Sequence, residues 1–148
     1  MTAVLALVLA SCGGGGSSTP APTPTQPDPS ASVNVSGTWT GTATDASGAG
    51  PMSWQLTQAN TSFSGIVTMT DTATGINGRG SVSGTLSGSS IRFSIAVPSG
   101  GFDSPFASCT ATVSGDGQAS SSSLTGTYTG SSSCGGSIGS GSFTLNKQ

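Results

Sequence analysis

The sequence predicts an all-β fold, a small antiparallel up-and-down barrel of about eight strands that follows a disordered N-terminal tether. Three observations support this prediction. After residue 35 apolar residues recur at every second position, which is the period of a half-buried strand. Clusters of Gly, Asn, Asp and Pro divide these runs and would break any helix. The net charge is only −2, whereas disordered chains usually combine low hydrophobicity with a high net charge.

Residues 1–11 have the features of a signal peptide. The apolar run Ala3–Ala10 is too short to span a bilayer, but it suits the apolar region of a signal peptide. It leads into Leu9-Ala10-Ser11-Cys12, which resembles the lipobox of bacterial lipoproteins. A core strand with an incidental cysteine is the alternative. Signal peptides normally open with Lys or Arg, so Met1-Thr2 leads us to expect an upstream start or a truncated sequence.

The lipobox resemblance has consequences for location. It implies that residues 1–11 are removed and that Cys12 becomes a lipid-modified, palmitate-bearing N-terminus. The chain would then be a lipoprotein of the cell envelope, anchored at the outer membrane with its domain on the periplasmic or surface face. We therefore expect the protein to be attached to a membrane through its N-terminal lipid.

Residues 12–33 are expected to form a linker, because they are rich in Gly and Ser and then in Pro. Proline favours extended polyproline conformations, so about twenty residues at ~3 Å each could hold the domain up to ~60 Å from the lipid. A passive spacer is the favoured interpretation, and a Pro-rich recognition motif is the alternative.

Residues 34–148 are expected to hold the barrel domain, with its first four strands at residues 36–44, 52–57, 63–69 and 80–86. In the second run Met52, Trp54 and Leu56 share one face, and the third run repeats this alternation from Phe63. Turns are expected at 45–51 and 75–78, where Gly, Asp, Asn and Pro are frequent.

The last four strands are predicted at residues 91–97, 109–113, 124–128 and 143–145. Two loops between them are long, namely Pro98–Pro105 with Phe102 at its tip, and Ser131–Ser140. Closing the sheet into a barrel removes the exposed edges of a flat meander, and a two-sheet sandwich is the alternative.

Glycines within the strands indicate tight curvature, because they let a strand coil or let a large side chain lie against the backbone. The expected covering side chains are aromatic: Trp39, Trp54, Phe63, Phe93, Tyr128 and Phe143. The segments Gly37-Thr38-Trp39 and Leu124–Tyr128 look like strand patterns of calycin-type barrels such as lipocalins and avidins. That resemblance implies a ligand site in the barrel mouth, whereas Trp39 is expected to plug the barrel bottom. One Tyr and two Trp are too few for an avidin-type biotin site.

The cysteines are expected to divide by role. With Cys12 taken by the lipid, Cys109 and Cys134 remain as an even pair in an exported protein, for which a disulfide is the default outcome. Such a bridge would stabilise the domain by ~3 kcal/mol. A redox or metal role is disfavoured because the chain has no His and no Cys-x-x-Cys.

Composition argues against an enzyme, a metal or cofactor site, and a nucleic-acid partner. The chain has no His to serve as a general base, and its acids Asp45, Asp71, Asp103 and Asp116 are all expected in turns. Its three basic residues form no cluster, whereas a nucleic-acid surface needs several.

The leading hypothesis is therefore a non-catalytic envelope lipoprotein that binds a small apolar or glycan ligand or an envelope protein. The residues expected to line a ligand pocket are Trp54, Phe63, Phe93 and Tyr128. The runner-up is an inhibitor barrel that acts on a hydrolase through one of the two exposed loops. A structural or adhesive surface protein is a third possibility.

Overall fold

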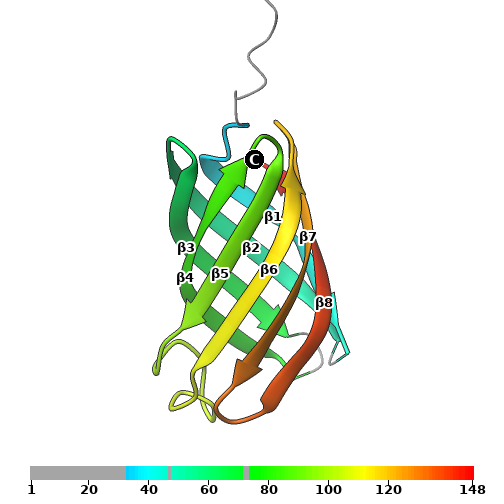
Figure 1. The fold of residues 1–148 in the computed structure, drawn as a ribbon. Coiled ribbons are helices and arrows are strands. Elements are labelled where there is room, and N and C mark those ends of the chain that lie inside the picture. The colour runs from blue at the N-terminus through cyan, green and yellow to red at the C-terminus, as the bar shows by residue number, and fades with distance from the viewer. Residues whose placement is uncertain (1–32, 47, 72–73) are drawn as a thin grey trace, which may run out of the picture.

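The fold is a closed eight-stranded antiparallel barrel, as the alternation predicts (Figure 1). The computed structural model describes residues 33–148 except 47, 72 and 73. The predicted signal peptide, the predicted lipidation site Cys12 and nearly all of the predicted linker lie outside these residues. The described part of the chain contains no helical segment with the length and hydrophobicity that a membrane-spanning helix needs.

Each strand pairs with its neighbours in chain order, and β1 closes the barrel by pairing with β8. The strands are β1 (Gly37–Asp45), β2 (Gly48–Ala59), β3 (Ser62–Asp71), β4 (Ile76–Ser87), β5 (Ser90–Val97), β6 (Ala111–Ala119), β7 (Ser123–Ser132) and β8 (Gly136–Lys147).

The barrel has two different ends. The hairpins β2–β3, β4–β5 and β6–β7 lie at the end where the described chain begins and finishes, which we call the closed end. The hairpins β1–β2, β3–β4 and β7–β8 and the long loop 98–110 lie at the other end, which we call the mouth end (Figure 1).

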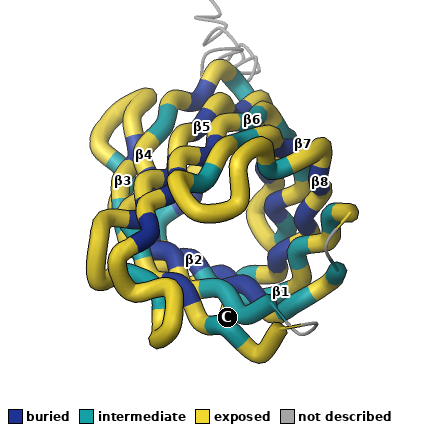
Figure 2. The backbone as a smooth tube through the Cα atoms, turned by 90° about the horizontal axis from the view of Figure 1, so that it is seen from below, coloured by how far each residue is buried: buried dark blue, intermediate teal, exposed yellow. Residues whose placement is uncertain are grey.

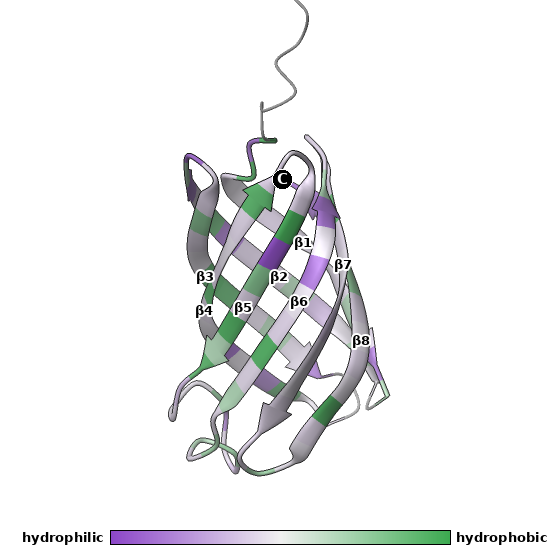
Figure 3. Cartoon of the chain, in the orientation of Figure 1, coloured by the Kyte–Doolittle hydropathy of each residue, from purple (hydrophilic) through white to green (hydrophobic). Residues whose placement is uncertain are grey.

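The interior is apolar and the outer wall is made mostly of small polar residues. Buried positions alternate with exposed or partly exposed ones along most of the strand residues, and Figure 2 shows this from the mouth end. No polar or charged residue is classed as buried among those described. Strongly hydrophilic residues are few along the strands (Figure 3). Because successive side chains of a strand point to opposite faces, the apolar residues point into the barrel while Ser, Thr and Gly form most of its outer surface.

Aromatic side chains pack against glycines on the neighbouring strand, as the sequence predicts. Phe63 lies directly opposite Gly84, and Phe143 lies directly opposite Gly126. A Cβ on Gly126 would come within 2.7 Å of Cε1 of Phe143. Because glycine has no side chain, these positions leave room for the aromatic rings to lie against the sheet. The rings can then fill the interior of a small, strongly curved barrel.

Trp39 closes the barrel at the closed end, as expected for a plug. Its side chain is fully buried, and its indole N–H donates a 2.8 Å hydrogen bond to the carbonyl oxygen of Val35. Lys147 Nζ lies 5.2 Å from the centroid of the Trp39 ring. The main-chain N–H of Gln148 bonds to the carbonyl of Thr38, so both ends of the described chain cover this side of the interior.

Several predicted turns are wrong. The segment 45–51 is mostly strand, because β1 continues to Asp45 and β2 already begins at Gly48. The predicted loop Ser131–Ser140 shrinks to residues 133–135, since β7 and β8 pair as far as Ser132 and Gly136.

Asp116 also lies inside a strand instead of a turn. It faces outward from β6, and its carboxylate accepts a 2.9 Å hydrogen bond from Nε of Arg92 on β5. Both side chains are largely exposed, so this ion pair contributes little to stability.

Candidate functional site

A cavity of about 370 Å³ occupies the mouth half of the barrel. Its lining is mainly apolar and comes from every strand of the barrel and from the loop 98–110. Met52, Trp54 and Phe93 contribute from β2 and β5, and Tyr128 and Phe143 from β7 and β8. The cavity is therefore a product of the closed barrel and not of one hairpin.

Three aromatic rings close the inner end of the cavity. The centroid of Trp54 lies 5.1 Å from those of Phe93 and Phe143, which are 5.5 Å from each other. The two phenylalanine rings meet edge to face, the geometry that aromatic quadrupoles favour. Trp39 and Phe63 lie nearer the closed end and do not line the cavity. These three rings form an apolar surface, which we call the aromatic floor.

The indole N–H of Trp54 is the exception in this floor. Its Nε1 is buried and has no hydrogen-bond partner among the described residues. Leaving a buried donor unpaired costs about 1–3 kcal/mol, so an acceptor that reached it would stabilise the protein.

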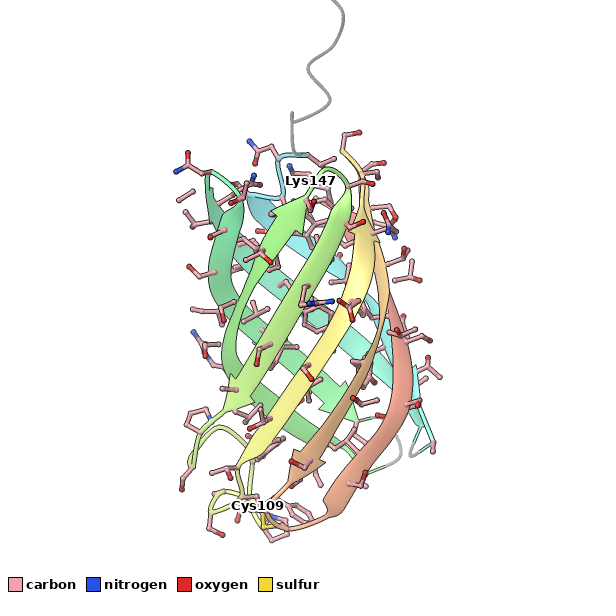
Figure 4. The ribbon with its side chains drawn as sticks, viewed as in Figure 1. Cys109 and Lys147 are labelled. Carbon is pink, nitrogen blue, oxygen red and sulfur yellow. A yellow bond between two sulfur atoms is a disulfide. The ribbon has the colours of Figure 1, made fainter. Side chains whose placement is uncertain are left out.

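The loop 98–110 forms one side of the mouth and is held at both of its flanks. On the β4 side, the N–H of Arg79 donates to the carbonyl of Gly101, and the Asn77 side chain donates to Asp103. On the other side, a disulfide joins Cys109 to Cys134 in the β7–β8 turn. The structure thus confirms the predicted disulfide, which lies at the mouth end (Figure 4).

Phe102 does not form a protruding loop tip as predicted. It pairs with Gly78 of β4 through an isolated bridge, and its half-buried ring packs against the core cluster. Gly78 permits this contact, because a Cβ there would lie 2.9 Å from Cε1 of Phe102. Phe106 is the exposed aromatic of the loop, and both rings line the cavity.

One polar pair stands out in the lining. The hydroxyl of Tyr128 donates a 3.1 Å hydrogen bond to Oδ2 of Asp45. Tyr128 lies on β7 and Asp45 on β1, so the tyrosine ring must cross β8, and it does so over Gly141, which has no side chain to block it. Burial, and then the charge and hydrogen bond of Asp45, raise the pKa of Tyr128. The phenol therefore remains a donor to this carboxylate.

Asp45 and Asp71 are the charged side chains in the lining, where the described residues place no Lys, Arg or His. The Asp71 carboxylate accepts a hydrogen bond from the hydroxyl of Thr74. The described residues contain no group of three or more His, Cys, Asp or Glu that could hold a metal ion.

Of the four residues predicted to line a pocket, the structure brings three together. Trp54, Phe93 and Tyr128 line the cavity, whereas Phe63 is buried in the core outside it. Sequence reasoning missed Asp45, which it assigned to a turn. The spacing along the strand could have indicated this position. Asp45 follows Trp39 by an even number of residues, so the two side chains lie on the same, inward face of the strand.

The sequence matches no protein-family model and no curated protein.

Proposed function

We propose that this chain is a non-catalytic binding protein of the cell envelope whose barrel takes a small apolar ligand into the cavity at its mouth end. The lipobox-like Leu9–Cys12 segment supports a lipid anchor on Cys12. The observation that carries the binding proposal is the cavity itself. Its volume of about 370 Å³ falls within the range typical of small-molecule sites.

The composition of the lining supports an apolar ligand over a glycan. A sugar offers many hydroxyl groups, and each would need a polar partner in the site. Here the inner end is the triad of Trp54, Phe93 and Phe143. Removing apolar ligand surface from water is favourable by roughly 25 cal/mol per Å².

The test is the binding of a neutral fluorescent apolar probe, N-phenyl-1-naphthylamine, to the full chain carrying Cys12→Ser so that no lipid is attached. We expect saturable enhancement of the probe's emission. Ala111→Phe, which fills the cavity from β6, should weaken binding at least tenfold. The matched control is Thr112→Phe, the next residue on the same strand but on the outer face, which should bind as the parent does.

A second cavity-filling variant and a check of folding distinguish loss of the cavity from misfolding. Ala43→Phe acts from β1 on another wall of the cavity, and each variant is compared with the parent by circular dichroism. The proposal fails if the parent shows no saturable binding, or if folded Ala111→Phe and Ala43→Phe bind the probe as the parent does.

The alternative function, inhibition of a hydrolase through a loop, draws its support from the exposed loop 98–110 and its Phe106 ring, which is 39% exposed. The inward contact of Phe102 and the attachments of the loop to β4 favour a cavity wall instead. Stoichiometric capture of one hydrolase from envelope extract, lost in Phe106→Ser and accompanied by no probe binding, would replace the small-ligand proposal with this one.

A further inference from the structure

We infer that the ligand is a hydrophobic amine, whose apolar body lies on the aromatic floor while its ammonium group lies beside the carboxylate of Asp45. This inference rests on the proposed binding function and adds the chemical class of the ligand. It is carried by the combination of an apolar cavity with charge of one sign in its lining.

The charge distribution is one-sided. Asp45 and Asp71 line the cavity, and among the described residues no cation does so. The three basic residues lie elsewhere: Arg92 pairs with Asp116 on the outer wall, Lys147 lies over Trp39 at the closed end, and Arg79 is exposed on the outer face of β4. The charge in the described lining is therefore negative only.

An apolar wall strengthens the effect of these carboxylates. Clefts lined by one sign of charge with low-dielectric walls concentrate the field and attract counter-ions. A fatty acid entering the same cavity would bring its carboxylate toward Asp45, where like charges repel. An alkylammonium would be attracted, and the faces of the lining aromatic rings also favour a cation. The cavity should therefore rank amine above neutral alcohol and alcohol above acid.

Tyr128 positions the carboxylate for this role. Its hydroxyl donates to Oδ2 of Asp45 on β1, and its ring, which comes from β7, lies over Gly141 of β8. Accepting this hydrogen bond from a neutral phenol leaves the negative charge of the carboxylate in place, and that charge is what would attract an ammonium group. Both Tyr128 and Asp45 line the cavity. The ammonium group of a bound ligand would therefore lie next to the Asp45 carboxylate, at the place where Tyr128 holds it.

The experiment compares three probes that share an eight-carbon chain: octylamine, 1-octanol and octanoate. Each competes with N-phenyl-1-naphthylamine for the full chain carrying Cys12→Ser at neutral pH, where octylamine is protonated. We expect octylamine to bind about tenfold more tightly than 1-octanol, and octanoate to bind more weakly than 1-octanol, since tenfold corresponds to ~1.4 kcal/mol, within reach of one charge pair near a protein surface.

Asp45→Asn should lower the ratio of octylamine affinity to 1-octanol affinity from about tenfold to about one, because the amide carries no charge. Its matched control is Asp116→Asn, the same change on the outer wall, which should keep the full ranking. A second measurement uses the parent protein alone. Added salt should weaken octylamine binding but not 1-octanol binding, since screening acts only on charges.

The possible outcomes separate the two proposals. Equal affinity for all three probes, or a preference for octanoate, would overturn the amine assignment while leaving the binding proposal intact. Loss of the amine preference in Asp71→Asn but not in Asp45→Asn would overturn the assignment to Asp45. Failure of the fluorescent probe and all three competitors to bind would overturn the binding proposal itself.

Discussion

At the scale of single residues, Tyr128 joins the stability of the barrel to its candidate site. It is the one tyrosine of the chain, and its side chain is only 9% exposed. Burial is the main reason that its pKa is raised, and the neighbouring Asp45 adds charge repulsion and a hydrogen bond that only the protonated phenol can donate. Ionising Tyr128 would place a second negative charge beside a carboxylate.

This arrangement predicts a loss of stability at alkaline pH. The folded protein holds the phenol proton above the ordinary tyrosine pKa of about 10, whereas the unfolded chain releases it near that value. The unfolded state then binds fewer protons, so the free energy of unfolding falls as pH rises above ~10 and is unaffected by this group below it. Phenolate absorbance should rise near pH 10 in denaturant and at higher pH in the folded protein.

Tyr128→Phe is the control for this prediction, because it keeps the ring over Gly141 and removes the titrating group. Urea midpoints of this variant should vary less across the same alkaline range than those of the parent. A folded-state absorbance titration that coincides with the unfolded one would contradict the raised pKa.

At the scale of secondary-structure elements, the pairing of β7 with β8 depends on glycine. Gly126 faces Phe143 directly, and a Cβ on it would lie 2.5 Å from the carbonyl oxygen of Asp116 on β6. Backbone cannot move away cheaply in a closed barrel. We therefore expect Gly126→Ala to lower the free energy of unfolding by about 1–3 kcal/mol, the usual range for overpacking, as measured by urea denaturation.

Gly139→Ala is the matched control on β8. A Cβ at Gly139 would meet no atom within 4 Å, so its effect should stay within about 0.5 kcal/mol, as for most surface substitutions. Equal effects of the two substitutions would show that strand glycines act through backbone entropy and not through the space they leave for aromatic rings.

At the scale of the whole molecule, alternation was sufficient to predict the barrel but not the bounds of its strands. Period-two runs such as Met52, Trp54 and Leu56 indicate which side chains face inward. The Gly115-Asp116-Gly117 sequence is typical of a turn, yet β6 passes through it. There the Phe93 ring lies over Gly115 and Arg92 pairs with Asp116. Both partners lie more than twenty residues away in the chain, so local sequence does not reveal them.

The candidate site shows the same limit. Alternation predicts whether a side chain faces inward, but its height along the barrel axis depends on the stagger between strands. Trp54 and Phe63 are both buried and aromatic, yet only Trp54 reaches the cavity, because Phe63 stands near the closed-end start of β3. The loop residues Phe102 and Phe106 enter the lining through contacts that no periodicity signals.

The membrane anchor is also a proposal about the whole molecule. Because Cys12 lies outside the described residues, its test is biochemical. In cells supplied with labelled palmitate, we expect the protein to carry label and to sediment with membranes, and Cys12→Ser should lose the label and become soluble. Cys134→Ser, which removes one sulfur atom of the mouth-end disulfide, should keep the label. Label that persists in Cys12→Ser would contradict the anchor.

The positions of the two chain ends have a practical consequence. Val33 contacts Gly88 and Gln148 contacts Thr38, so the described chain enters and leaves on the side of the Trp39 plug. A reporter protein fused after Gln148, or a sensor chip coupled there, would lie at the end of the barrel opposite the loop 98–110 (Figure 1). The protein could thus be displayed on a solid support with its opening turned toward the sample.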